Sequence, residues 1–226
     1  MRRLLTYTLI LLFGTLLALW SPWLRWNISI ADLLGAEKPE SIAGLQVFSL
    51  AGELNIYVDD EFQGTVTTDN SPYFINNITP GERRIRVERK SDTNGAYWNF
   101  NRLISFEEGN DVVISYNIGP SEEFSTGNFI YTTKSSEDEK NRAKLNFKLN
   151  VEDSIISIDN ITKVVDGYTV SEYVNLDKQY SVKVSKSGYE DLEFTLLPSE
   201  SELRSELEGH DLNVEVNLML QPVLVE

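Results

Sequence analysis

The sequence predicts a mainly β fold, built as two tandem small antiparallel β-sandwiches that follow an N-terminal transmembrane helix. Beyond residue 44, apolar and polar residues alternate in short runs, which is typical of strands with one buried face. Turn-forming residues separate these runs about every 8–12 residues, as in sandwiches and barrels. Residues 1–26 differ from the rest, because they contain one long apolar stretch without charge.

Residues 4–24 form this apolar stretch, and about 20 such residues are enough to cross a hydrocarbon core. Arg2 and Arg3 precede it, Arg25 follows it, and tryptophans gather at its C-terminal end, where interfacial aromatic rings settle. The excess of positive charge before the stretch predicts a cytoplasmic N-terminus. We therefore expect a signal anchor over residues 1–26 of a single-pass protein of the cell membrane, with the C-terminal domains extracytoplasmic.

Two alternatives to an uncleaved anchor stay open. A cleaved signal peptide needs two small residues spaced two apart, and 34–36 (Leu-Gly-Ala) offers only one of them. A buried helix of a soluble protein would carry a polar stripe, whereas this stretch is apolar on all sides. Residues 27–44, with their small, charged and turn-forming residues, are predicted to be a linker.

The charge balance argues against some partners. The chain has 20 Lys and Arg against 35 Asp and Glu, a formal net charge of −15, and its first acid is Asp32. Such a surface repels phosphate backbones and anionic leaflets, so we expect no nucleic-acid partner. Because there is no cysteine, disulfides, thiol catalysis, cysteine zinc sites and a lipidated cysteine are excluded.

The alternating runs fall into two series. The polar, charged stretch 135–142 interrupts the pattern and is predicted to link a first sandwich at residues 45–134 to a second at 143–226. The runs of the first series are residues 54–60, 83–90, 111–118 and 127–134. Those of the second are residues 143–151, 154–159, 167–174, 179–186, 190–197 and 212–220.

The two series resemble repeats. Residues 56–60 (IYVDD) match 156–160 (ISIDN) at an offset of 100. Residues 75–90 match 174–186, with Ile85 over Val182 and Val87 over Val184 at an offset of 97. We therefore expect two related units.

One helix is predicted near residues 199–208, inside the second unit. Ser199 lies three residues before Glu202, which is the spacing of a capping box. Leu203 and Leu207 share one face, and Gly209 supplies a C-terminal stop. Its expected role is to cover one end of the second sandwich.

The first unit resembles the PEGA domain of bacterial surface and membrane proteins. The shared pieces are a strand that ends in Val-Asp at 57–60, a Gly-Thr at 64–65, and a Pro-Gly-Glu turn at 80–82 before an alternating strand. Asp60 stands where the family usually has Gly, and 66–68 (Val-Thr-Thr) replaces its usual Thr-Pro.

The second unit is a more degenerate match, because it keeps only pieces such as 158–159 and 187–189 and lacks the Pro-Gly-Glu turn. The resemblance covers residues 45–134 well and 143–221 weakly. It implies small Ig-like sandwiches displayed outside the membrane by a PEGA domain protein. It implies no shared ligand and no catalytic residues.

The sequence predicts neither a catalytic residue nor a cofactor or metal site. His210 is the single histidine and follows a predicted helix end, where a structural role is ordinary. The acidic runs 59–61 and 137–139 lack the alternating spacing of calcium loops. No nucleophile elbow, zinc motif, P-loop or dinucleotide glycine pattern is present.

Aromatic residues offer the candidate contact patch. Tyr97 and Trp98 are neighbours, so they would face opposite sides of any strand they share, and one of them would face outward. An outward aromatic ring beside Asn99 could stack on a sugar or anchor a peptide. The alternative is that Trp98 fills the core and Tyr97 covers an edge.

These observations predict a non-enzymatic, membrane-anchored binding or structural protein that contacts wall polymer, glycan or surface protein at the cell envelope. The alternative is a scaffold subunit of a membrane complex, recognised through its transmembrane helix, where Gly14 and Ala18 form a small-xxx-small pair, or through an open sheet edge. A hydrolase with an unrecognised site is a third hypothesis.

Overall fold

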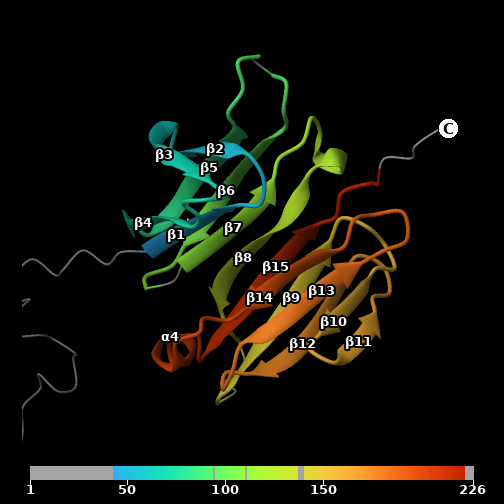
Figure 1. The fold of residues 1–226 in the computed structure, drawn as a ribbon. Helices are drawn as coiled ribbons and strands as arrows, with labels where there is room; N and C mark the ends of the chain where they lie inside the picture. Colours follow the sequence, from blue (N-terminus) through green and yellow to red (C-terminus); the bar gives the residue numbers. More distant parts are fainter. Residues whose placement is uncertain (1–42, 94, 110, 137–139, 222–226) are drawn as a thin grey trace, which may run out of the picture. The chain divides into compact units, whose positions relative to one another are not determined.

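A computed structural model describes residues 43–221, apart from Asn94, Asn110 and residues 137–139 (Figure 1). The predicted transmembrane helix over 4–24 and residues 27–42 of the predicted linker lie outside the described residues. Within the described part of the chain, no helix has the length and hydropathy needed to span a bilayer. From Ala43 on, the described residues form one compact unit that is mainly β.

The described strands form three sheets. The central sheet has seven strands in the order β12 (Thr169–Asn175), β9 (Arg142–Leu149), β15 (His210–Asn217), β8 (Thr126–Lys134), β7 (Asp111–Asn117), β1 (Ala43–Ser49) and β4 (Tyr73–Ile78). The first small sheet runs β3 (Glu61–Thr67), β2 (Glu53–Val58), β5 (Gly81–Arg89) and β6 (Asn99–Phe106). The second small sheet runs β11 (Ile161–Val164), β10 (Ile155–Ile158), β13 (Tyr180–Ser185) and β14 (Leu192–Leu196).

Each small sheet packs over its own half of the central sheet and encloses its own core. The first core includes Leu45, Ile56, Val87 and Phe100. The second core is formed by another set, which includes Leu145, Ile156, Val184 and Leu196. The fold is therefore a layered β structure in which two small sheets share one large one.

Strand β8 supplies side chains to both cores. Phe129 is buried in the first core and Tyr131 packs against it, whereas Ile130, between them, packs against the second core. Because successive side chains of a strand point to opposite faces of a sheet, the two cores lie on opposite faces of the central sheet. Strand β8 pairs with β7 on one side and with β15 on the other, so it joins the halves (Figure 1).

The pairing registers of the two halves agree with the offsets found in the sequence. Val87 of β5 lies opposite Ile56 of β2, and Val184 of β13 lies opposite Ile156 of β10. In the central sheet, β1 pairs antiparallel with β4 and parallel with β7, and β9 pairs in the same two ways with β12 and β15. The two halves thus repeat one order of strands.

The turn aspartates of the two halves also have matching roles. The backbone N–H of Asp59 donates to the carbonyl of Arg84 (2.8 Å), and its carboxylate accepts from the N–H of Arg84 (2.9 Å). Asp159 makes the same two bonds with Ser181, at 2.7 and 2.9 Å. Both aspartates have positive φ, which this residue type tolerates in turns. Their side chains hold the hairpin turn against the neighbouring strand.

Several strands were not predicted from the sequence. These are β1, which begins in the last residues of the predicted linker, and β3, β4, β6 and β11. Strand β11 is exposed along its whole length, so it lacks the alternation that reveals a strand. The break predicted at residues 135–142 falls between β8 and β9, yet the central sheet continues across the two halves.

The helix prediction is correct in place but wrong in its capping. The helix α4 spans Ser201–Glu206, and its N-cap residue is Glu200, which makes no side-chain capping bond. The expected capping box from Ser199 to Glu202 is therefore not formed. Leu207 packs against the second core as expected, but Leu203 is exposed, so the predicted apolar face is incomplete.

Arg204 holds α4 in place instead. Its side chain is buried, and its guanidinium donates to four backbone carbonyls at 2.6–3.1 Å, those of Leu176, Asp177, Pro198 and Ser199. A guanidinium can make these bonds together because its donors are arranged in a planar fork. The buried Arg204 side chain therefore fixes the position of α4, a role that the sequence assigns to a capping box and to an apolar face of Leu203 and Leu207.

The shared strand β8 leads to a prediction about cooperativity. Leu45 and Leu145 occupy matching places in the two halves, opposite Val112 and Leu212, and both are fully buried. Each Leu→Ala substitution should cost about 2–5 kcal/mol. We expect either variant to speed global amide exchange of both β7 and β13, as measured by hydrogen-exchange mass spectrometry. Faster exchange confined to the mutated half would contradict a single cooperative unit.

Candidate functional site

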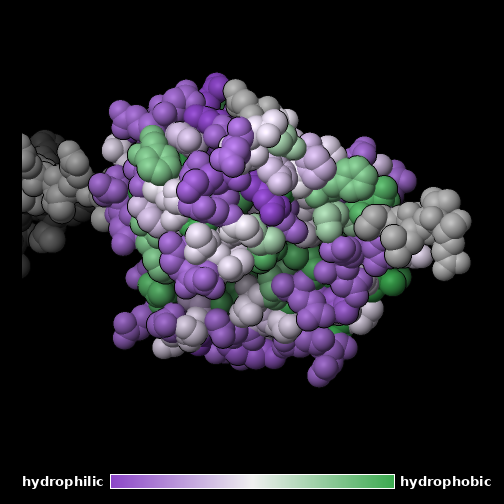
Figure 2. Space-filling view, turned by 45° about the horizontal axis from the view of Figure 1, so that its top comes forward, coloured by the Kyte–Doolittle hydropathy of each residue, from purple (hydrophilic) through white to green (hydrophobic). Residues whose placement is uncertain are grey.

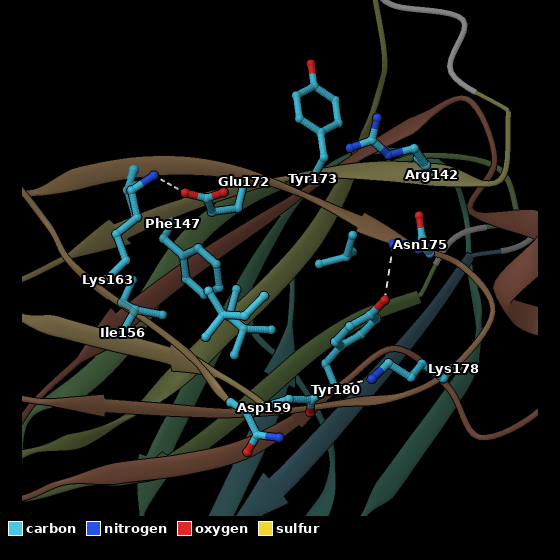
Figure 3. A pocket seen from close by; sticks show the side chains of 15 residues that line it. Arg142, Phe147, Ile156, Asp159, Lys163, Glu172, Tyr173, Asn175, Lys178 and Tyr180 are labelled. Carbon is cyan, nitrogen blue, oxygen red and sulfur yellow. Dashed lines mark hydrogen bonds and ion pairs between the residues drawn. The ribbon is translucent and has the colours of Figure 1, made fainter.

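An open groove lies at the edge of the second half, between β11 and β12 (Figure 3). Its volume is about 510 Å³, within the usual range of ligand pockets. The floor is apolar and is formed by Phe147, Ile156, Ile158, Val170 and Val174. Both bordering strands are sheet edges, because β11 ends the second small sheet and β12 ends the central sheet.

At the matching place in the first half, the Tyr73 side chain bridges the two sheets. Tyr73 lies opposite Val47 in the β1–β4 pair, and Val170 lies opposite Phe147 in the β9–β12 pair. The Tyr73 hydroxyl donates to the carbonyl of Gln63 on β3 at 2.7 Å, so this side chain spans from the central sheet to the first small sheet. The smaller Val170 cannot reach across.

The two halves also differ at the position of Gly64, where the second half has Lys163. A Cβ at Gly64 would overlap the Tyr73 ring, so glycine is needed beneath the tyrosine. Gly64 pairs with Ile56 of β2, and the residue that pairs with Ile156 of β10 is Lys163. The second half therefore has a long cation where the first half has no side chain.

A third exchange places a charge at the mouth of the groove. Ile75 pairs with Leu45 and is buried, whereas Glu172 pairs with Leu145 and is partly exposed. Glu172 and Lys163 form an ion pair between β12 and β11 (Figure 3). Because 52% of the Lys163 side chain and 38% of the Glu172 side chain are exposed, solvent screens this pair, and its contribution to stability is small.

The opposite end of the groove is bordered by a second polar group. Lys178 Nζ lies 2.6 Å from Asp159 Oδ2 and 4.8 Å from the centre of the Tyr180 ring. The backbone N–H of Asn175 on β12 donates to the Tyr180 hydroxyl at 3.2 Å, as the dashed line in Figure 3 shows. This end is therefore fixed by contacts among its own residues.

The groove is locally less acidic than the chain. Arg142, Lys163 and Lys178 supply three cations, against two acids, Asp159 and Glu172. The chain as a whole has a formal net charge of −15. A partner with a neutral or acidic segment thus meets less repulsion here than over the average surface.

On the face drawn in Figure 2, hydrophilic residues cover most of the surface and hydrophobic ones emerge in smaller areas.

The predicted contact patch consists of one exposed residue and two packed ones. Trp98 packs on Phe100 and Tyr116, with ring centroids 6.4 and 6.0 Å apart, and its backbone N–H donates to the carbonyl of Gly119. Tyr97 is covered by the guanidinium of Arg89, 4.8 Å from its ring centre.

Both aromatic rings of this patch are partly buried against the first core, and Asn99 is exposed at the start of β6. Tyr97 and Trp98 precede β6 rather than share a strand, so the alternation argument does not apply to them. Ligand contact by Tyr97, Trp98 and Asn99 stays a prediction.

His210 begins β15 and lies near acidic groups. Its Nε2 is 3.9 Å from Glu107 Oε2, and its Nδ1 is 3.2 Å from the carbonyl of Glu208. In the part of the chain that the structure describes, no group of three His, Cys, Asp or Glu side chains could hold a metal ion.

The groove residues were missed from the sequence, although a signal was present. Extending the offset of 97 to Tyr73 and Ile75 places Val170 and Glu172 beneath them. At the first position a large aromatic residue is replaced by a small one, and two residues later an apolar residue is replaced by a charged one. Such a pair of replacements indicates that the second copy is less tightly packed there. The signal needs two aligned copies, because Val170 alone reads as an ordinary strand residue.

The chain matches no protein-family model and no curated protein. Among solved structures, the Bacillus anthracis TIE protein matches with 12% identity and a TM-score of 0.28, over 80% of this chain and 34% of that one. A mutant shaft pilin, SpaA, from Lactobacillus rhamnosus GG matches with 7% identity and a TM-score of 0.23, over 81% of this chain and 100% of that one. This chain thus spans about a third of the TIE protein. Such TM-scores carry no argument about fold or function.

Asp159 at the groove rim leads to a pH prediction. The Lys178 ammonium and the Ser181 N–H donate to its carboxylate and hold its pKa below the ordinary value. The stability that this gives is present above about pH 4 and is lost as the pH falls through the lowered pKa. Asp159→Asn should therefore lower the melting temperature at pH 7 and flatten its fall between pH 7 and pH 3.

The matched control is Asp69→Asn, in the exposed connection between β3 and β4. It should keep the pH dependence of the original chain. Melting curves of the Asp159→Asn variant that parallel those of the original chain at every pH would contradict the assignment.

Proposed function

We propose that this chain is a non-catalytic binding protein of the cell envelope, anchored in the membrane by residues 4–24 and displaying its β modules outside. The observation that carries the proposal is the open groove between β11 and β12. It has an apolar floor for contact area and ion pairs at its rim for orientation, which is the make-up of a recognition site.

The comparison of the two halves supports different roles for them. Both halves have the same order of strands and the same aspartate-locked turn, but only the first is closed by Tyr73. A gap that exists because a packing side chain is absent costs stability, and binding of a partner can offset that cost. In this proposal the first half is mainly structural and the second half binds.

We further infer that the halves are tandem copies of a PEGA-like sandwich, a clear one in the first half and a more degenerate one in the second. The residues that carry the resemblance occupy turns with a defined task, since Asp59 locks the hairpin after β2 and Pro80 leads into β5. Extracytoplasmic display would then place the modules beside wall polymer, glycan or surface protein.

A scaffold subunit of a membrane complex is the second candidate function. The observation that favours it is the central sheet, which ends in two edge strands, β4 and β12. An open edge can accept a strand from another protein. Replacing residues 4–24 by an unrelated membrane helix distinguishes the candidates: a binding protein keeps its partner, and a subunit recognised through its membrane helix loses it.

The main test is a pull-down of solubilised envelope material on the immobilised full chain. We expect retention of one wall polymer, glycan or surface protein, identified by sugar analysis and mass spectrometry. Retention of nothing above blank resin would contradict the binding proposal.

A Tyr97→Ala/Trp98→Ala double variant run in parallel tests the predicted aromatic patch. Loss of binding counts only if circular dichroism shows a folded chain, because Trp98 packs against the first core. The Tyr97→Ala single variant removes a residue at the edge of that core and serves as the milder comparison. Full retention by folded forms of both variants would remove the patch from the binding site.

A further inference from the structure

We propose that the β11–β12 groove receives a tyrosine side chain from an extended segment of a partner protein, which adds to β12 as an extra strand. This inference rests on the proposed binding function and specifies the chemistry of the partner. The first half of the chain supplies the template, because there a tyrosine of the chain itself, Tyr73, fills the matching space.

The size of the occupant follows from the comparison of the two halves. Val47 and Phe147 hold matching positions, and so do Tyr73 and Val170. In the first half a phenol ring bridges the two sheets, whereas in the second half the same place is a groove with an apolar floor. A ring supplied from outside would regain the dispersion contacts that the smaller Val170 cannot make.

The polar end of the ring also has a counterpart. The Tyr73 hydroxyl donates to the carbonyl of Gln63, in the small-sheet edge strand β3. Val165 directly follows β11, and its backbone N–H donates to the carbonyl of Ser154, which directly precedes β10. Because backbone groups alternate along a strand, the carbonyl of Thr162 points away from β10. An incoming phenol therefore finds an acceptor on the matching edge.

The edge of β12 can accept the backbone of the partner. The carbonyl of Tyr168 accepts from Leu149 on β9, and the N–H of Leu176 donates to Asn141 next to β9. The N–H of Asn175 instead points into the groove, toward Tyr180. By alternation, the backbone groups of Thr169 and Ser171 also point away from β9, toward the position of an added strand.

An added strand would send alternate side chains into the groove and to the outer face of the sheet. Above the groove it would cover Ile161, a groove-lining residue of β11 that is 77% exposed. The Lys163–Glu172 pair lies in its path, but a solvent-exposed pair is easily opened. The rim cations favour a neutral or acidic segment. A second copy of this chain is disfavoured, because it carries the same net charge of −15.

The probe is a fluorescein-labelled peptide, Glu-Thr-Val-Thr-Tyr-Thr-Val-Thr-Glu, titrated with the full chain in detergent micelles and followed by fluorescence anisotropy. Empty micelles give the blank. A matched peptide with Ser in place of Tyr reports what the ring contributes. We expect the Tyr peptide to bind at least about tenfold more tightly than the Ser peptide. Equal affinities would overturn the proposal by themselves, whatever the variants do.

Three variants test the location. Val170→Tyr puts a ring into the groove itself, so it should weaken peptide binding at least about tenfold. Thr195→Tyr adds the same ring at an exposed position of β14, which does not line the groove, and it should bind within about threefold of the original chain. Tyr73→Val should open a second groove in the first half and raise the stoichiometry from one peptide to two. Undiminished binding by folded Val170→Tyr would place the peptide elsewhere and overturn the assignment.

The outcomes separate this inference from the proposed function. Retention of envelope material by the original chain, without any preference for the Tyr peptide, would sink the groove assignment and leave the binding function standing. Absence of any retained envelope material would instead sink the binding function. Self-association in sedimentation velocity that Val170→Tyr abolishes would identify a second copy as the occupant and overturn the choice of a separate partner.

Discussion

The pairing of β8 with β15 is the interaction on which the rest of the structure depends. It connects strands far apart in the sequence and makes one sheet of the two halves. Because β8 faces one core with Phe129 and the other with Ile130, neither core is complete without this strand. The halves are therefore related in sequence pattern but coupled in packing, and a loss in one half is felt in the other.

This coupling explains how the second half can have an open edge. A small sandwich on its own buries little apolar surface and has little stability to lose. Here the second half shares its largest sheet with a half in which Tyr73 closes the corresponding space over Gly64. The shared sheet helps to stabilise the second half. That half can therefore have Val170 and Glu172 where the first half has the packed residues Tyr73 and Ile75.

The sequence predicted the features that depend on local periodicity and turn chemistry. Alternation located β5, β7 and β13, and the offsets of 97 and 100 gave the correct registers of Val87 and Val184. It did not locate β1, β3, β4, β6 or β11, whose residues carry weak or no alternation. The capping box was wrong because the buried Arg204 fixes α4 through long-range carbonyls, which no local spacing reveals.

The candidate site shows the same limit in a sharper form. Tyr97 and Trp98 attracted notice because aromatic neighbours are conspicuous in a sequence, yet both pack against the first core. The groove forms where the second half has the small Val170 and the charged Glu172 in place of the large Tyr73 and the apolar Ile75 of the first half. Taken alone, neither Val170 nor Glu172 indicates a groove. In a chain built of repeats, a binding site can therefore be found from differences between the copies. The first copy has the side chain, Tyr73, that the second copy lacks, and the proposed tyrosine-bearing partner is inferred from this difference.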